Sequence, residues 1–164
     1  MMMMSSVVSA THNEPAIGFG PHLMLDCRQC DYDKINSLDV VYNFLNELPE
    51  LVGMTKIIPP YVFPYSGLIP EDKGITGMVI IAESHLTFHS FVEKDYFFFD
   101  MFSCKPFDVA KVEQHVIETF GVKSYERFYS ERGRYFPRGS ALHLPEDMGL
   151  TATQLVEEAT AVSV

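Results

Sequence analysis

A serine, a carboxylate and two histidines directly follow an apolar stretch in the middle of the chain. The stretch ends at Ala82, and Glu83, Ser84 and His85 come next, with His89 a few residues further on. If the chain turns sharply there, the Ser84 hydroxyl lies beside the Glu83 carbonyl and can attack it, exchanging an amide for an ester. A nearby base can then remove the α-hydrogen, which breaks the chain, and hydrolysis leaves a pyruvoyl group on the new N-terminus. This segment is therefore a candidate site of self-cleavage.

Two further residues have the chemistry that such a reaction needs. An imidazole with a pKa of about 6.5 is mostly neutral in the cell, so His89 is the candidate base. A thiol with a pKa of about 8.5 carries its proton, so Cys104 is a candidate proton donor. A regular strand would put Ser84 and His89 on opposite faces, so this hypothesis requires a break between them. The alternatives are an ordinary serine in a β-turn and a buried structural cysteine.

Short segments on both sides of these residues predict a sheet. Apolar or alternating patterns indicate strands at residues 22–27, 78–82, 86–91, 96–103 and 124–130. Three prolines restrict residues 57–65 to an edge strand or an extended loop, and the glycines and proline of residues 66–74 indicate a loop.

Two segments have the periodicity of amphipathic helices. Apolar residues recur every three and four positions over residues 35–48 and over residues 108–120. We expect Pro49 and Gly53 to end the first of these helices. Asp108 is the expected N-cap of the second helix and Gly121 lies where its left-handed C-terminal residue should be. The order of elements predicts an α+β fold, a two-layer sandwich with a mostly antiparallel sheet covered on one face by two main helices.

Composition limits the class of protein. A chain of 164 residues with 47% hydrophobic residues predicts a single folded domain. A net charge of -10 disfavours binding to nucleic acid and is compatible with a cationic small substrate. No apolar run reaches the roughly 20 residues that cross a bilayer, and the start lacks the features of a signal peptide, so we expect a cytoplasmic protein.

The sequence also predicts the domain boundaries and the state of the cysteines. We expect a disordered extension over residues 1–16, a domain over residues 17–140 and an acidic tail over residues 141–164. Three cysteines indicate reduced thiols, and the lone C-x-x-C of Cys27 and Cys30 is assigned a structural role. The histidines have no spacing that predicts a metal site.

Several short motifs occur in the order and at about the spacing of one enzyme family. They are Met54-Thr55-Lys56-Ile57, Pro60-Tyr61-Val62-Phe63, Gly74-Ile75-Thr76-Gly77, Ala82-Glu83-Ser84-His85, His89, Asp100-Met101-Phe102-Ser103-Cys104 and Glu131-Arg132-Gly133-Arg134. Over residues 20–137 the chain resembles the prokaryotic, pyruvoyl-dependent S-adenosylmethionine decarboxylase proenzymes.

The resemblance implies a role for each matching residue. Cleavage between Glu83 and Ser84 would give a β chain of residues 1–83 and an α chain of residues 84–164. Ser84 would become the pyruvoyl cofactor that forms a Schiff base with the substrate amine. His89 matches the proton acceptor of processing, Cys104 matches the proton donor of catalysis, and Thr76 stands where the family has a serine that assists processing.

The resemblance also implies a substrate and an assembly. The enzyme would release carbon dioxide from S-adenosylmethionine and form the aminopropyl donor of spermidine and polyamine biosynthesis, as a homodimer of processed protomers. Aromatic faces and carboxylates suit a sulfonium substrate, which makes Phe63, Phe91 and Glu93 candidate contacts. After His89 the chain has Val92 where the family has proline. A pyruvoyl-dependent arginine or ornithine decarboxylase, or a noncatalytic regulatory paralogue, therefore remains an alternative.

Overall fold

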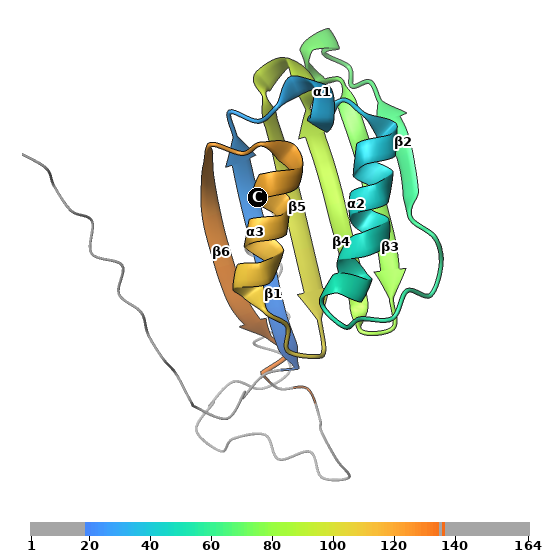
Figure 1. Cartoon of the computed structure of the whole chain (residues 1–164), viewed down its shortest axis with the longest axis vertical. Coiled ribbons are helices and arrows are strands. Elements are labelled where there is room, and N and C mark those ends of the chain that lie inside the picture. The colour runs from blue at the N-terminus through green and yellow to red at the C-terminus, as the bar shows by residue number, and fades with distance from the viewer. Residues whose placement is uncertain (1–18, 135, 137–164) are drawn as a thin grey trace, which may run out of the picture. The chain divides into compact units, whose positions relative to one another are not determined.

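The protein is a six-stranded antiparallel sheet with its helices on one face (Figure 1). The computed structural model describes residues 19–134 and 136, so the expected N-terminal extension and acidic tail lie outside the described residues. The elements are β1 (Gly20–Arg28), α1 (Tyr32–Ile35), α2 (Leu38–Leu51), β2 (Tyr61–Tyr65), η1 (Pro70–Asp72), β3 (Gly74–Ile81), β4 (Ser84–Phe91), η2 (Val92–Lys94), β5 (Tyr96–Ser103), α3 (Val109–Phe120) and β6 (Ser124–Arg132).

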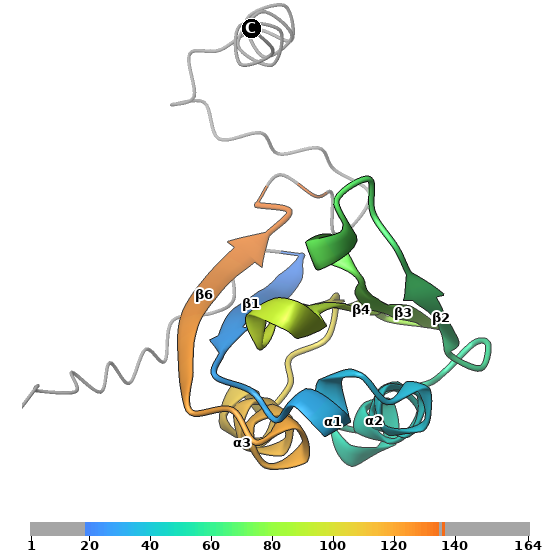
Figure 2. The same ribbon diagram turned by 90° about the horizontal axis from the view of Figure 1, so that it is seen from above.

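The strand order is β2-β3-β4-β5-β1-β6, and every neighbouring pair is antiparallel. α1, α2 and α3 all lie on the same side of the sheet, as the view from above makes clear (Figure 2). The α+β sandwich expected from the sequence is therefore confirmed. No helix in residues 19–134 is long and apolar enough to cross a membrane.

The core lies between the sheet and the two long helices. Alternate residues of each central strand point into it because side chains along a strand alternate between the two faces. Phe44 of α2 and Phe120 of α3 pack with ring centroids 4.9 Å apart, and Phe88 and Phe97 of the sheet lie 4.9 and 5.0 Å from Phe120. All four rings are almost fully buried. This packing fixes the positions of β4, which begins at Ser84, and of β5, which ends just before Cys104.

The helix predicted over residues 35–48 starts later than expected, and it ends between the two expected terminators, Pro49 and Gly53. Ser37 starts α2 as an N-cap, because its hydroxyl accepts a hydrogen bond from the Val40 amide at 3.3 Å. The preceding residues form the separate short helix α1. Pro49 does not end α2, which continues to Leu51, and the Pro49 carbonyl accepts a bond from the Met54 amide at 2.7 Å. A proline in the last turn removes one amide hydrogen bond and is tolerated there.

The strand predicted over residues 78–82 was too short, and Gly74 was predicted to lie in a loop. β3 begins at Gly74 and pairs with β2 on one side and β4 on the other. A Cβ on Gly77 would lie 2.7 Å from the Leu45 side chain, and a Cβ on Gly74 would collide with the Ser90 carbonyl. These glycines allow close approach of α2 and β4 rather than interrupting the strand. The prolines of residues 57–65 left an edge strand or an extended loop open, and the structure has an edge strand there, β2, over Tyr61–Tyr65.

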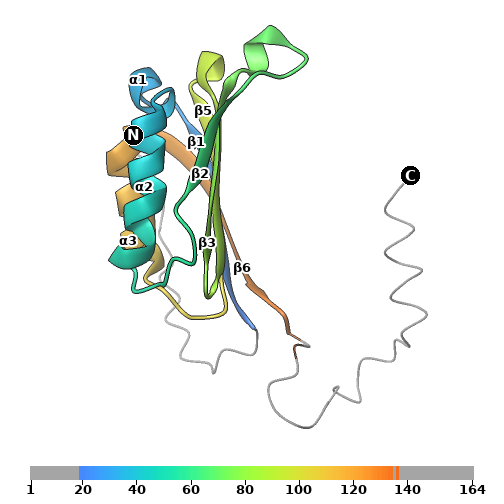
Figure 3. The same cartoon turned by 90° about the vertical axis from the view of Figure 1, so that its right-hand side faces the viewer.

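The face of the sheet opposite the helices carries no covering element among the described residues (Figure 3). Large apolar side chains on this open face are strongly exposed, and they include Tyr61, Tyr65, Met78, Phe98 and Phe128. His85 and His89 share this face, because alternate residues of β4 point away from the core. The open face therefore combines an apolar surface with the histidines that the sequence singled out.

Candidate active site

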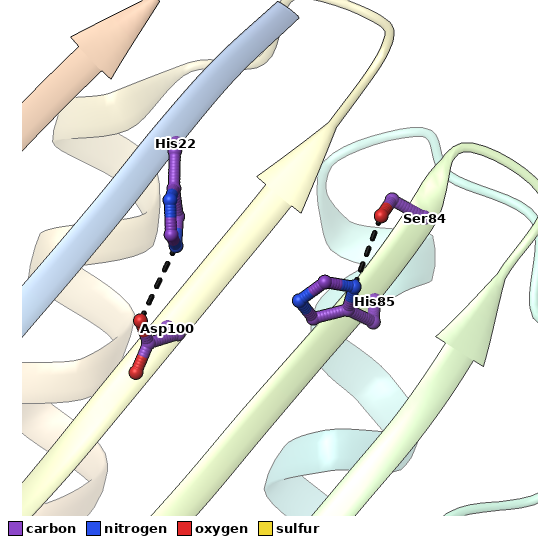
Figure 4. Close-up of polar contacts among 4 residues, drawn as sticks. All are labelled: His22, Ser84, His85 and Asp100. Carbon is purple, nitrogen blue, oxygen red and sulfur yellow. Dashed lines mark hydrogen bonds and ion pairs between the residues drawn. The ribbon is translucent and has the colours of Figure 1, made fainter. Parts of the chain in front are cut away.

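The Glu83–Ser84 step lies in the tight turn between β3 and β4. Ser84 pairs with Ile81 across this turn and has a φ of 154°, a conformation that L residues rarely adopt. Such a backbone costs about 1–3 kcal/mol. In this backbone conformation the Ser84 hydroxyl lies 3.0 Å from Nδ1 of His85, the side chain of the next residue (Figure 4). Neighbouring side chains of a regular strand point to opposite faces and cannot meet in this way. The sharp turn predicted from the sequence is present.

Three backbone amides hold Glu83 and its turn. The Cys104 amide donates to the Glu83 carbonyl at 2.9 Å, and the Thr55 amide donates to the Glu83 carboxylate at 3.1 Å. The Ala82 amide donates to the Thr55 carbonyl at 2.8 Å. The carbonyl that Ser84 would attack therefore already has a donor aimed at its oxygen. A donor so placed stabilises the negative charge that develops there during attack.

β5 brings Cys104 to this turn from twenty residues away. Ser84 pairs with Ser103 in the β4–β5 register, and Cys104 follows directly, half-buried. The buried Ser103 hydroxyl accepts a bond from the Lys105 amide at 3.0 Å and donates to the Lys105 carbonyl at 2.8 Å. These bonds fix the bend after β5. The structure thus brings Cys104 next to the Glu83–Ser84 step.

Sequence reasoning missed a pair of polar residues, His22 and Asp100, whose charges act on His85. His22 of β1 lies 3.2 Å from the Asp100 carboxylate of β5, and both share the open face with His85 (Figure 4). Burial lowers the pKa of His85, and His22 and Arg132 lower it further, whereas Asp100 opposes them. His85 is therefore neutral at cellular pH. Asp100 lay within a motif of the family resemblance, but its proximity to His22 depends on strand pairing.

His89 and Thr76 form a separate cluster near the other end of β4. The Thr76 hydroxyl lies 2.5 Å from Nδ1 of His89, and the two residues face each other in the β3–β4 register. The rings of Tyr65 and Phe91 pack on His89 with centroids 5.3 and 4.8 Å away. Burial lowers the pKa of His89, which keeps the imidazole neutral.

The expected break between Ser84 and His89 is absent. β4 pairs without interruption with β5 from Ser84 to Phe91. Five residues at about 3.3 Å each separate the two Cα atoms by about 16 Å. Within one chain, the candidate base His89 therefore cannot reach the candidate nucleophile Ser84. The site consists of two half-sites near opposite ends of β4: the Ser84 half-site, with Glu83, His85 and Cys104, and the His89 half-site, with Thr76.

The candidate substrate contacts lie mostly with His89 rather than with Ser84. Phe63 faces Thr76 in the β2–β3 register, and Phe91 packs on His89. The Glu93 carboxylate forms an ion pair with Lys73 at 2.7 Å in the surface turn after β4. Phe63 and Phe91 thus belong to the half-site of His89, and Glu93 is occupied by a salt bridge.

Cys27 and Cys30 lie apart from both half-sites, as buried free thiols. Burial raises the pKa of Cys30 to about 12 and raises the pKa of Cys27 far above its usual range. Both thiols therefore remain protonated, and their structural role stays a prediction.

A family model described as S-adenosylmethionine decarboxylase matches residues 21–133 of this protein. The chain belongs to this family. It is 28% identical over 115 residues to an S-adenosylmethionine decarboxylase proenzyme of Anoxybacillus flavithermus, covering 70% of this chain and 87% of the relative. A proenzyme of the same description from Clostridium botulinum is 30% identical over 108 residues, covering 65% and 88%.

A solved structure supports the fold. The adenosylmethionine decarboxylase of Aquifex aeolicus matches with a TM-score of 0.59 and 24% identity, over 76% of this chain and 98% of that chain. The curated proenzyme of Thermotoga petrophila is 28% identical over 131 residues, or 78% of this chain. The protein is therefore a member of a decarboxylase family.

Proposed function

We propose that this chain is a proenzyme that cleaves itself between Glu83 and Ser84 and then decarboxylates S-adenosylmethionine for polyamine biosynthesis. One observation carries the proposal: the Glu83 carbonyl accepts a hydrogen bond from the Cys104 amide at 2.9 Å while the adjacent Ser84 has a strained φ of 154°. The strain favours reaction at this peptide bond, and the amide stabilises the oxyanion. The relatives that share the family are named as proenzymes of this decarboxylase.

The residues present fit the pyruvoyl group that the family implies. Cleavage would place the group at the first residue of β4, on the open face beside His85 and next to the bend that carries Cys104. A pyruvoyl group supplies a carbonyl that takes up the substrate amine and accepts the electrons released with carbon dioxide. The S–H group of Cys104 would supply the proton to the α-carbon of the product.

We further propose that the active enzyme is a homodimer. The open face exposes several apolar side chains, Phe98 and Met78 among them, which is typical of an interaction surface. The separation of about 16 Å between Ser84 and His89 also leaves each half-site incomplete in one chain. A second copy packed against the open face in the opposite direction would bring its Thr76–His89 pair to Ser84. The cytoplasmic location expected from the sequence remains a prediction.

Intact-protein mass spectrometry tests this function. The wild-type protein should give two chains, with the α chain blocked at its N-terminus by a pyruvoyl group. Ser84→Ala should remain one chain without activity, whereas Cys104→Ala should still be cleaved, because its backbone amide is retained, but should decarboxylate poorly. A single uncleaved wild-type chain would refute the pyruvoyl mechanism. Carbon dioxide release from S-adenosylmethionine, arginine and ornithine, each tested alone, then decides the substrate.

A further inference from the structure

The Ser84 hydroxyl has a histidine partner in its own chain that the proposed roles leave unused. Nδ1 of His85 lies 3.0 Å from the Ser84 hydroxyl oxygen (Figure 4). His89 lies five residues further along β4, bonded to Thr76. We infer that His85 is the catalytic base that takes the Ser84 hydroxyl proton in the ester-forming step of self-cleavage. This inference rests on the proposed function and assigns the first of its two proton transfers.

The His85 ring is held in place on the open face. It packs edge to face on Phe102 of β5, with ring centroids 6.0 Å apart, and its backbone pairs with Ile80 on one side and Phe102 on the other. The strained φ of Ser84 turns the hydroxyl toward this ring instead of toward the opposite face. A donor and an acceptor fixed at 3.0 Å are within the range for proton transfer.

The surroundings of His85 keep its lone pair available. The charged and titratable groups that face it are His22 on β1, Asp100 on β5 and Arg132 on β6, while its β3 neighbour Ile80 is apolar. Burial lowers the pKa of His85 most, and His22 and Arg132 lower it further. With its proton on Nε2, the neutral ring presents Nδ1 as an acceptor to the serine.

The step balances with groups of this chain alone. Nδ1 of His85 takes the hydroxyl proton as the Ser84 oxygen bonds to the Glu83 carbonyl carbon, and the carbonyl electron pair moves to its oxygen. The Cys104 amide stabilises that oxyanion. When the carbon–nitrogen bond breaks, its electron pair stays on the Ser84 nitrogen, which takes the proton back from Nδ1. The result is an ester, a free amine and a neutral His85.

His85 and His89 then act in two different proton transfers of self-cleavage. The first takes a proton from the hydroxyl oxygen of Ser84, where His85 lies. The second takes the α-hydrogen of the ester and breaks the chain, and it falls to the proposed processing residue His89, with Thr76 bonded to its Nδ1. Loss of either histidine should therefore stop processing at a different chemical species.

Hydroxylamine distinguishes these species, because at neutral pH it cleaves esters much faster than amides. The probe is applied to purified precursors of His85→Asn and His89→Asn. His89→Asn should accumulate the ester and be split by hydroxylamine into a β chain ending in the Glu83 hydroxamate and an α chain beginning with an intact Ser84. His85→Asn should form the ester about 100-fold more slowly than the wild type or worse, and should stay intact with or without hydroxylamine.

The choice of asparagine separates a base from a positioning residue. Its side-chain amide stands near the place of Nδ1 and can hold the hydroxyl by a hydrogen bond, but it cannot accept the proton. Wild-type cleavage by His85→Asn, or rapid splitting of it by hydroxylamine, would overturn the inference. His85→Gln and circular dichroism of both variants exclude misfolding as the cause of a block, and His115→Asn on α3 is a matched control that should cleave normally. An uncleaved wild-type protein would instead refute the proposed function.

Discussion

Replacing Gly20 with alanine should slow self-cleavage, because Gly20 contacts the Ser103–Cys104 peptide on the side opposite Glu83. The carbonyl of that peptide faces Gly20, and its amide donates to the Glu83 carbonyl at 2.9 Å. In Gly20→Ala the new Cβ would collide with the Ser103 oxygen and lie 2.7 Å from Cys104 Cα. Carbon atoms in contact are about 3.5–4.0 Å apart, so the peptide must move by about 1 Å. The Cys104–Glu83 hydrogen bond has an ordinary length of 2.9 Å, so a shift of this size lengthens or tilts it and misdirects the amide.

The expected effect has two parts with separate readouts. Overpacking should lower the free energy of unfolding by about 1–3 kcal/mol. Removing one oxyanion donor costs about 10²–10³-fold in rate, and a tilted donor retains part of its effect, so cleavage should slow by about 10- to 100-fold. The assay follows the precursor band on a denaturing gel and its mass with time after refolding.

A destabilised control separates the two parts. Val112 is buried in α3, remote from the turn, and Val112→Ala should lose about 2 kcal/mol of stability without slowing cleavage. Both variants should show the wild-type circular dichroism spectrum at the temperature of the assay. If folded Gly20→Ala cleaves at the wild-type rate, the Cys104 amide does not stabilise the oxyanion and the reasoning fails.

Three further predictions concern the core, pH and assembly. Ser90→Ala should cost about 2–4 kcal/mol in urea unfolding, because the buried hydroxyl accepts from the Ile75 amide at 2.9 Å and donates to the Ile35 carbonyl at 3.0 Å; a loss below about 1 kcal/mol would contradict this. Burial lowers the pKa of His115 in the folded protein, so at low pH the unfolded chain binds one proton more than the folded chain. The free energy of unfolding should therefore fall as pH drops below about 6.5, and His115→Phe should flatten this slope in the uncleaved precursor. An unchanged slope would show that His115 does not cause it. Phe98→Glu should shift the protein from dimer to monomer in light scattering, and a persistent dimer would place the interface elsewhere.

The sequence alone determined what is local or periodic. The Glu83–Ser84 step identifies its own reaction, because the nucleophile and the carbonyl that it attacks are covalent neighbours. The helix over residues 108–120 was also predictable, because its N-cap at Asp108, its periodicity and its left-handed Gly121 all lie within a few residues of one another. The α+β class followed in the same way from the order of such segments.

Only the tertiary structure decided which distant groups meet. Strand register places the Cys104 amide on the Glu83 carbonyl and pairs His22 with Asp100, and no local pattern determines a register between separate strands. Whether a glycine ends a strand or allows close packing likewise depends on what lies across from it, so β3 was predicted too short. The same continuous pairing that keeps His89 about 16 Å from Ser84 leaves His85, its neighbour in sequence, as the histidine at the reacting hydroxyl.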